Sequence, residues 1–477
     1  MDNRVVELSK LFKQKYGVEP QRVSPMPLSG SDRVYFRMFG DNFSVIGAYN
    51  PNLVENRAFF SFTKTFQGLS LPVPELLAVS ANEKYYLQQD LGDTSLLSLI
   101  TADSPNGFEN VKPLLINVLE LLAEFQVRGA NVLDYSLCYP KADFDRRSVM
   151  WDLNYFKYSF LKPAGVHFNE DELEDDFESL TKMLLNDDME FFLYRDFQSR
   201  NVMVTDGKPY FIDYQGGRRG PCLYDVVSFL FQAKAGFPPM LRAELLDVYL
   251  AKLASLRSVD KLKLWERFHL FALFRVIQTL GAYGFRGLFE GKAHFIQSIP
   301  MAIDNLVWLS ENSSYLHGFP SLYSLIEPLR EKFPLAGEQN HDFAGLTIDI
   351  SSFSLKKGYP HADAQHGGGF IFDCRFLPNP GRLPEYRNLT GLDAPIQGYL
   401  ESIPETAQFA NRVEAIVLEA VEQYQQRGFE HLSVGFGCTG GQHRSVYFAQ
   451  WLANLLSSKA NVRVKLQHVE LEKMGDK

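Results

Sequence analysis

The sequence has few cysteines and no long apolar run. Its four cysteines, Cys138, Cys222, Cys374 and Cys438, are far apart among 477 residues and form no CxxC pair. We therefore expect neither a disulfide framework nor a zinc site, and this cysteine usage suits a reducing compartment. The longest apolar stretches, such as residues 268–274, are far shorter than the roughly 18 residues of a membrane span. Because the N-terminal segment is also too polar for a signal peptide, we expect a cytoplasmic protein.

The sequence also lacks an excess of positive charge. Its 48 Lys and Arg residues face 57 Asp and Glu residues, a formal net charge of −9. This balance disfavours broad, nonspecific binding to nucleic acids or membrane surfaces, although it is compatible with a local basic patch. The hydrophobic and charged fractions, 45% and 22%, are close to those of globular proteins and exclude wholesale disorder. The length predicts two to four domains.

The order of patterns along the chain predicts a small α+β lobe, a larger helical lobe and a separate C-terminal domain. Strands are expected at residues 34–39, 43–48 and 85–89, and helical spacing dominates from residue 112 onward. The acidic run 170–176 is interpreted as a solvated helix face rather than a metal site, because Leu173, Phe177 and Leu180 supply an apolar stripe. We predict small and large lobes at about 1–92 and 93–335, a linker at 336–344 and a domain at 345–477.

The segment 191–217 carries the spacing of a phosphoryl-transfer site. Asp196 and Asn201 follow one apolar strand, and Asp213 ends the next. In kinases, such a loop carboxylate accepts the proton of the substrate hydroxyl, while an amide five residues later and a second carboxylate hold Mg²⁺ against the ATP phosphates. Asp196 is therefore the candidate base, and Asn201 and Asp213 are the candidate metal ligands. The alternative is a strand–turn–strand whose Asp and Asn side chains make turn hydrogen bonds.

These motifs resemble the aminoglycoside phosphotransferase-like kinases, most closely those that phosphorylate N-acetylmuramate and N-acetylglucosamine at C1. The resemblance covers about residues 1–335 and is carried by segments 195–201, 212–215, 220–228 and 274–281. It implies an α+β bilobal protein-kinase-like fold that uses ATP and Mg²⁺. It also implies nucleotide contacts from a phosphate loop and from the hinge between the lobes, at Ser29, Gly30, Ser31, Asp32, Arg33, Arg37, Gln89 and Leu91.

Two departures from the family pattern bear on activity. Tyr194 replaces the His that usually precedes Arg-Asp, which we expect to change the support of the loop more than its chemistry. Strand 43–48 lacks the Lys that normally holds the ATP phosphates. Either Arg33 or Arg37 supplies that charge, or the domain is a degenerate nucleotide binder. Without the Lys, Glu55 has no obvious partner and is interpreted as a surface charge.

A second anion site is expected near the C-terminus. Strand 432–436 leads into Cys438, Thr439, Gly440, Gly441, Gln442, His443, Arg444 and Ser445. A glycine-rich turn that opens a helix directs several backbone N–H groups at one point, and Arg444 adds a guanidinium fork for a phosphate. The Cys-x₅-Arg-Ser spacing is also that of tyrosine-phosphatase-type enzymes, in which the thiol is the nucleophile. No acid loop is evident, however, so a phosphatase is an alternative rather than the preferred interpretation.

Segments 372–380, 390–393 and 438–447 resemble the RapZ C-terminal domain. That resemblance implies a smaller α/β domain with a phosphate-binding strand–loop–helix, which senses an amino-sugar phosphate with Asp373 and Arg375 beside the 438–445 turn. RNA binding is less transferable, because the C-terminal tail lacks the family's basic character. The sequence as a whole predicts an amino-sugar kinase of cell-wall salvage fused to a sugar-phosphate sensor, with self-association through the C-terminal domain as a further expectation. A non-catalytic regulator of RNA or of a protein partner is the other alternative.

Overall fold

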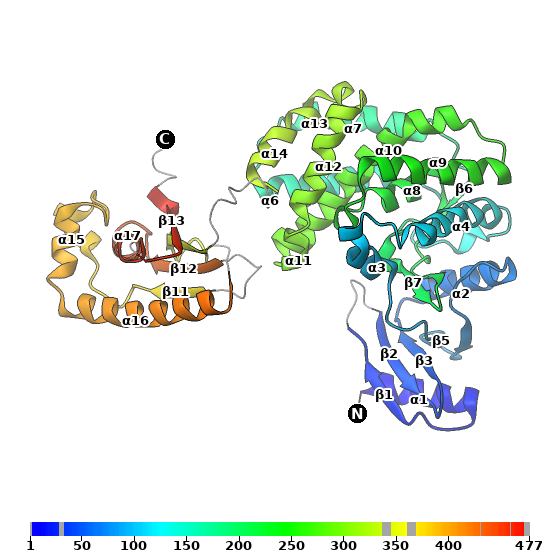
Figure 1. Ribbon diagram of the computed structural model, residues 1–477, viewed down its shortest axis with the longest axis horizontal. Coiled ribbons are helices and arrows are strands. Elements are labelled where there is room, and N and C mark those ends of the chain that lie inside the picture. The colour runs from blue at the N-terminus through cyan, green and yellow to red at the C-terminus, as the bar shows by residue number, and fades with distance from the viewer. Residues whose placement is uncertain are drawn as a thin grey trace. The chain divides into compact units, whose positions relative to one another are not determined.

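The computed structural model describes residues 2–27, 33–335, 345–359, 369–429, 431–457 and 459–471. The chain divides into two compact units, Met1–Leu335 and Ala336–Lys477, and each is described by itself (Figure 1). The expected linker at 336–344 lies outside the described residues. Within these segments, no helix has the length and apolar character needed to cross a membrane.

The first unit begins with a five-stranded antiparallel sheet in the order β1-β2-β3-β5-β4 (Figure 1). Helix α1 packs on this sheet through Leu8, Leu11 and Phe12 and ends at Gly17, whose left-handed φ of 78° suits a residue without a Cβ. Strands β1 and β4 were not predicted, because four residues carry too little alternation. The elements of this lobe are α1 (Asn3–Tyr16), β1 (Arg22–Pro25), β2 (Val34–Phe39), β3 (Ser44–Tyr49), α2 (Leu53–Gly68), β4 (Leu76–Val79) and β5 (Tyr85–Gln89).

The large lobe is mainly helical and carries two short strand pairs, β6–β9 and β7–β8. Its helices are α3 (Leu96–Asp103), α4 (Lys112–Ala130), α5 (Arg146–Phe156), α6 (Lys162–Ala164), α7 (Glu170–Leu185), α8 (Leu223–Leu230), α9 (Pro239–Leu256), α10 (Lys261–Tyr283), α11 (Ala293–Ile296), α12 (Ile299–Asn312), α13 (Pro320–Ser324) and α14 (Ile326–Lys332). The strands are β6 (Phe191–Leu193), β7 (Val202–Thr205), β8 (Lys208–Phe211) and β9 (Arg218–Gly220).

The acidic run folds as predicted. It opens helix α7, whose residues Leu173, Phe177 and Leu180 are buried, while the side chains of Glu170 and Glu174 pair with Lys157. Among the described residues, no group of three or more His, Cys, Asp or Glu side chains is arranged to hold a metal ion. The run therefore contributes an apolar stripe to the core and charges to the surface, as predicted.

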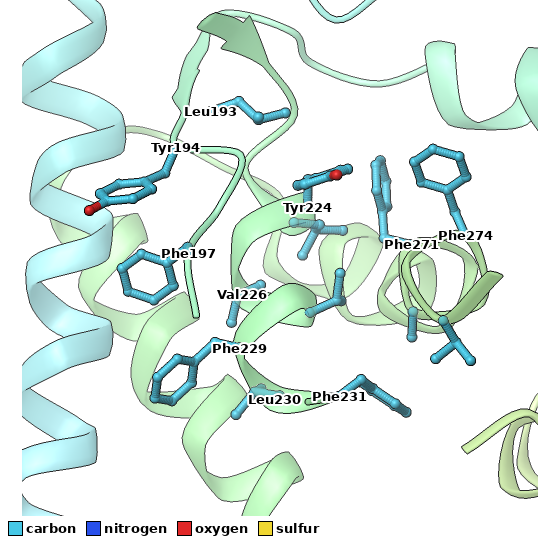
Figure 2. Close-up of a cluster of buried hydrophobic side chains, with 14 of the residues drawn as sticks. Leu193, Tyr194, Phe197, Tyr224, Val226, Phe229, Leu230, Phe231, Phe271 and Phe274 are labelled. Carbon is cyan, nitrogen blue, oxygen red and sulfur yellow. The ribbon is translucent and has the colours of Figure 1, made fainter. Parts of the chain in front are cut away.

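An aromatic core supports the segment 191–201. Figure 2 shows Tyr194, Phe197 and Phe229 along one side of this loop and Tyr224, Phe271 and Phe274 on the other. The rings of Tyr194 and Phe197 lie 5.3 Å apart, and those of Phe197 and Phe229 lie 5.5 Å apart. Because all of these rings are buried, the loop that carries Asp196 rests on a closely packed base.

The second unit is built on a four-stranded parallel sheet in the order β11-β12-β10-β13. Ile348 and Ile350 of β10 and Val434 of β12 pack in one core with Val417 of α16 and Leu452 of α17. Strand β13 was not predicted, although its sequence alternates between apolar and polar residues. The elements are β10 (Leu346–Ser354), β11 (Gly369–Asp373), α15 (Ala394–Glu401), α16 (Pro404–Gln426), β12 (His431–Cys438), α17 (Arg444–Leu456) and β13 (Val462–His468). The two units confirm the fold class predicted from the sequence.

Candidate active site and C-terminal anion site

The segment after β6 is held in an unusual backbone conformation. Arg195 and Asp213 have φ values of 80° and 68°, in the left-handed region that residues other than glycine rarely adopt. Each such residue costs about 1–3 kcal/mol and persists only where the surroundings enforce it. The contacts that hold this backbone conformation come from two side chains, Tyr194 and Asp225.

Hydrogen bonds from Tyr194 and to Asp225 anchor the loop. The hydroxyl of Tyr194 donates to the carbonyl oxygen of Ile212 at 2.5 Å and so links the loop to the residue before Asp213. Asp225, in α8, accepts the backbone N–H groups of Tyr194 at 2.7 Å and Arg195 at 3.0 Å, as well as the side-chain amide of Gln126 at 3.1 Å. Burial raises the pKa of Asp225 to about 7, although these hydrogen bonds oppose the shift.

The sequence reasoning assigned no role to Asp225. A buried Asp within the apolar helix 223–230 was the available signal, since a carboxylate in such a position needs several donors. The structure assigns it a positioning role, and it gives Tyr194 the supporting role expected of the residue that replaces His.

Asp196, Asn201 and Asp213 lie close together. The amide nitrogen of Asn201 donates to the backbone carbonyl of Asp196 at 2.8 Å and to Oδ2 of Asp213 at 3.3 Å. Burial raises the pKa of the Asp213 carboxyl, and the negative charge of Asp196 raises it further. Two carboxylates that repel each other, beside an amide, form an arrangement that a hard divalent cation would stabilise.

A polar network links this cluster to the small lobe. Gln215 donates to Oδ1 of Asp213 at 2.7 Å and to Oε1 of Glu55 at 3.4 Å. Glu55 in turn forms an ion pair with Arg33 at 2.8 Å and accepts the amide of Asn50 at 3.1 Å. The interpretation of Glu55 as a surface charge was therefore wrong: its partner is an Arg that precedes β2 rather than a Lys in β3.

The second candidate cation, Arg37, is engaged at the hinge. Its guanidinium donates to Asp93 at 2.9 Å and to Asp90 at 3.1 Å. The neighbouring hinge residues are also held by the protein: the N–H of Gln89 donates to the carbonyl of Glu75 at 2.9 Å, and the carbonyl of Leu91 accepts the hydroxyl of Thr205 at 2.6 Å. Of the two arginines, Arg33 is the one that joins the network of Glu55, Gln215 and Asp213. Residues Ser29, Gly30, Ser31 and Asp32 lie outside the described residues.

The C-terminal turn begins where β12 ends at Cys438 and finishes where α17 begins at Arg444. Gly441 has a φ of 72°, and a Cβ at this position would lie 2.5 Å from Cγ of Glu470 and 2.9 Å from the nitrogen of Ser354. Only glycine fits there. Thr439 is half-buried and Gly440 is exposed, so these two residues are the part of the turn that solvent or a ligand can reach.

Cys438 lies at the base of the turn. The N–H of Gly441 donates to its sulfur at 3.2 Å, and the hydroxyl of Ser445 lies 3.1 Å from it. Burial opposes ionisation, but these two contacts and the charge of Arg444 hold the pKa of the Cys438 thiol below its usual value. Burial raises the pKa of the neighbouring Cys374 well above its usual value. Cys438 is therefore the more readily ionised of the two thiols.

The polar side chains after Cys438 mainly fix the adjacent loop. Arg444 donates through Nη1 to the carbonyls of Arg375 and Leu377 at 3.0 and 2.6 Å, rather than directing that nitrogen at the turn. Gln442 and His443 likewise contact backbone carbonyls between residues 386 and 389. Asp373 and Arg375, expected to face the ligand, form an exposed ion pair with each other at 2.6 Å.

Comparisons with known proteins match the two units separately. Residues 27–262 match the model of the phosphotransferase enzyme family, and residues 346–472 match that of the RapZ C-terminal domain. A nucleotide-binding protein of Solibacter usitatus is 37% identical over 132 residues, which cover 28% of this chain and 39% of that protein. One from Alkalilimnicola ehrlichii is 40% identical over 133 residues, which cover 28% of this chain and 44% of that protein. The chain thus spans about two fifths of the length of these relatives.

Among solved structures, LicA in complex with AMP is similar over 65% of this chain and 99% of that chain, at 12% identity and a TM-score of 0.44. The family matches agree with the resemblance found in the sequence. Residues 27–262 are therefore similar to the phosphotransferase enzyme family, and residues 346–472 are similar to the RapZ C-terminal domain.

Proposed function

We propose that residues 1–335 form an ATP- and Mg²⁺-dependent sugar kinase. The observation that carries this proposal is the convergence of Asp196, Asn201 and Asp213 within a segment that matches a phosphotransferase family. The acceptor we propose is an amino sugar, N-acetylmuramate or N-acetylglucosamine, phosphorylated at C1. Such a reaction belongs to cell-wall sugar salvage (peptidoglycan recycling), and the four unpaired cysteines suit its place in the cytoplasm.

The residues present fit a bound Mg²⁺. Asp213 is a buried carboxylate whose charge is disfavoured by its burial and by Asp196, so a cation beside it would relieve both effects. Asn201 uses its amide nitrogen for both of its hydrogen bonds, which leaves the amide oxygen as a second ligand. When bound, Mg²⁺ would neutralise charge on the phosphates of ATP.

In the proposed reaction, Asp196 orients the acceptor hydroxyl and takes its proton. The hydroxyl oxygen forms a bond to the γ-phosphorus of ATP as the bond to the ADP oxygen breaks, so ADP leaves with the electron pair. Arg33 supplies the positive charge that the missing strand Lys would otherwise provide, and Glu55 holds it in position. The hinge residues Gln89 and Leu91 and the 29–32 loop complete the proposed nucleotide site.

The test compares Asp196→Ala with a matched control, Asp206→Ala. Asp206 is an exposed Asp in the β7–β8 turn, ten residues further along the same segment. Removal of a general base costs about 10²–10⁴-fold in rate, so we expect at least a hundredfold loss of kcat for Asp196→Ala and no change for Asp206→Ala. Phosphorus NMR of the products distinguishes an anomeric phosphate from a 6-phosphate. Full activity of Asp196→Ala would refute the assignment, and ATP binding without turnover in the wild type would favour a non-catalytic regulator.

For the second unit we propose an amino-sugar-phosphate sensor. In this proposal, backbone groups of Thr439, Gly440 and Gly441 contact the phosphate, and Asp373 contacts the sugar. Asp373 is already paired with Arg375, and Nη1 of Arg444 already donates to two carbonyls. The ligand would therefore have to engage the remaining hydrogen-bonding groups of Asp373 and Arg444. RNA binding and self-association through this unit are extensions of the RapZ resemblance.

A phosphatase is a second candidate for this unit, favoured by one observation. The sulfur of Cys438 accepts the N–H of Gly441, and the pKa of the thiol is lowered, as a nucleophilic cysteine requires. The discriminating experiment measures phosphate release from glucosamine 6-phosphate by the wild type and by Cys438→Ser. Release that disappears in Cys438→Ser supports the phosphatase, whereas binding without release by both proteins supports the sensor.

A further inference from the structure

A pocket beside the catalytic loop contains a buried arginine without a carboxylate partner. The cavity offers about 30 Å³ to a water-sized molecule, and it lies between the catalytic loop, α8 and α10. Its polar lining comes from Gln198, Ser228, Gln232, Arg275, Thr279 and Tyr283. Figure 2 shows α8 and α10 meeting near this place, with Tyr224 directed toward Phe271 and Phe274.

Arg275 is 4% exposed, and its hydrogen-bond partners are neutral. It donates to the hydroxyl of Ser228 at 2.7 Å, to the hydroxyl of Tyr224 at 3.2 Å and to the side chain of Gln278, whereas its Nε is buried without a partner. No carboxylate among the described residues forms an ion pair with it. The positive charge of Arg275 acts on Asp225, but the hydrogen bonds of the Asp225 carboxylate include those from the N–H groups of the catalytic loop. A buried guanidinium whose hydrogen-bond partners are all neutral would be stabilised by an anion that hydrogen-bonds to it.

The surroundings of the pocket are also cationic. Arg200 and Lys234 form no ion pair among the residues that the structure describes. Burial lowers the pKa of Lys234, and the nearby charge of Arg200 lowers it further. His294 shows the same pattern: burial comes first, and the charges of Lys234 and Arg200 add to it. In a chain of net charge −9, this cluster is a local positive region of the kind that attracts an anion.

The pocket shares residues and hydrogen bonds with the catalytic loop. Gln198 lies two residues after Asp196 and lines the pocket. Gln232, which also lines the pocket, accepts the N–H of Ser199 at 2.9 Å. The guanidinium groups of Arg195 and Arg275 both lie near the ring of Tyr224, at 5.4 Å and 4.9 Å from its centroid. A molecule in this pocket would therefore reach the loop that carries the proposed base.

We propose that this pocket is the anion subsite of the acceptor site and that Arg275 is its specificity-determining residue. The acceptor is then a sugar that carries a carboxylate or phosphate substituent. The guanidinium of Arg275 donates charge-assisted hydrogen bonds to that substituent. This inference rests on the proposed kinase function. The inference extends that function by assigning the class of substituent on the acceptor and the residue that recognises the substituent.

The test uses three probes with one sugar skeleton: N-acetylglucosamine, which is neutral, N-acetylmuramate, which bears a carboxylate, and N-acetylglucosamine 6-phosphate. Rates with ATP and Mg²⁺ and binding by calorimetry are measured for the wild type, Arg275→Gln and a control, Arg242→Gln. Arg242 is a similarly buried arginine of the same lobe that also bonds a neutral residue, Asn305, but it does not line the pocket.

We expect the wild type to prefer one of the two anionic sugars. Loss of a charge-assisted hydrogen bond weakens binding by about tenfold to a hundredfold, so Arg275→Gln should raise KM for that sugar by at least about tenfold. It should leave the neutral sugar nearly unchanged. Arg242→Gln should leave the preference intact, because any effect on stability acts on all three sugars alike. The sugar that loses most identifies the substituent as carboxylate or phosphate.

A second variant protects the test against a folding defect. Thr279→Glu places a carboxylate beside Arg275, so it should abolish the anionic preference without leaving a buried charge unpaired. Equal losses for neutral and anionic sugars, or an unchanged preference in both variants, would refute the subsite while turnover upholds the kinase. Binding of an anionic sugar that depends on Arg275 but gives no turnover would uphold the subsite and refute the kinase. Neither binding nor turnover would refute both.

Discussion

The ion pair between Arg33 and Glu55 leads to a quantitative prediction about nucleotide binding. Arg33→Met removes the cation that we propose in place of the missing strand Lys, and it retains an unbranched side chain of moderate length. The side chains are 3% and 18% exposed and their charged atoms are 2.8 Å apart, so both groups are largely removed from solvent. The variant therefore tests stability and function through one contact.

The expected loss follows from this geometry. At an effective dielectric constant of about 20, the attraction at this distance is about 6 kcal/mol before desolvation is subtracted. Breaking a buried pair by removing one partner costs about 3–5 kcal/mol. Because Glu55 keeps the amides of Asn50 and Gln215, we expect the lower end, about 3 kcal/mol. If Arg33 also contacts a phosphate, KM for ATP should rise at least about tenfold, the effect of one lost charge-assisted hydrogen bond.

Urea unfolding and ATP kinetics of the full chain measure the two effects. The control is Arg57→Met, which breaks an ion pair with Glu83 that also involves α2 but has 54% and 35% exposed side chains. Exposed pairs contribute about 0–1 kcal/mol, so this variant should lose little stability and keep its KM. An Arg33→Met protein with an unchanged KM for ATP would refute the proposed replacement of the Lys. A loss of stability no larger than that of Arg57→Met would refute the energetic reasoning.

Two further predictions concern buried positions. Burial raises the pKa of Asp225 from its ordinary value of 3.8 to about 7, so between these two pH values the folded protein holds a proton that the unfolded chain releases. The unfolding free energy of the wild type relative to Asp225→Asn should therefore be highest near pH 4 and fall by up to about 4 kcal/mol as the pH rises to 7; a difference independent of pH would contradict the burial argument. Gly441→Ala should destabilise the second unit and weaken binding of glucosamine 6-phosphate, since its Cβ would collide with Glu470 and Ser354. Gly398→Ala, at an exposed position of α15 where a Cβ meets no other atom, should do neither. Thermal unfolding and calorimetry measure both effects, and equal behaviour of the two glycine variants would contradict the steric reasoning.

Much of the fold could be predicted because long periodic segments identify their own structure. Helix α7 follows from its apolar stripe, and strands β2 and β5 follow from apolar runs bounded by turn residues. Strands β1 and β4 escaped prediction because each has only four residues and is completed by pairing with a neighbour. Pairing across a sheet depends on distant chain segments, which local patterns do not report.

The sequence by itself determined the chemical core of the proposed kinase site. Asp196, Asn201 and Asp213 lie within 18 residues, so their spacing along two connected strands was enough to predict their convergence. The same holds for the turn after Cys438, whose residues are consecutive and whose glycines indicate its backbone conformation.

Only the tertiary structure decided how this core is supported and charged. It pairs Arg33 with Glu55 and Arg37 with Asp90 and Asp93. It also places the carboxylate of Asp225 against the N–H groups of the loop. It also left Arg275 without a carboxylate partner among the described residues, which local sequence could not indicate. The physical reason is that these properties depend on burial and on contacts between segments 22 to 160 residues apart, as between Arg33 and Glu55 and between Glu55 and Gln215. Burial and distance in space, rather than spacing in sequence, set the energy of each charge.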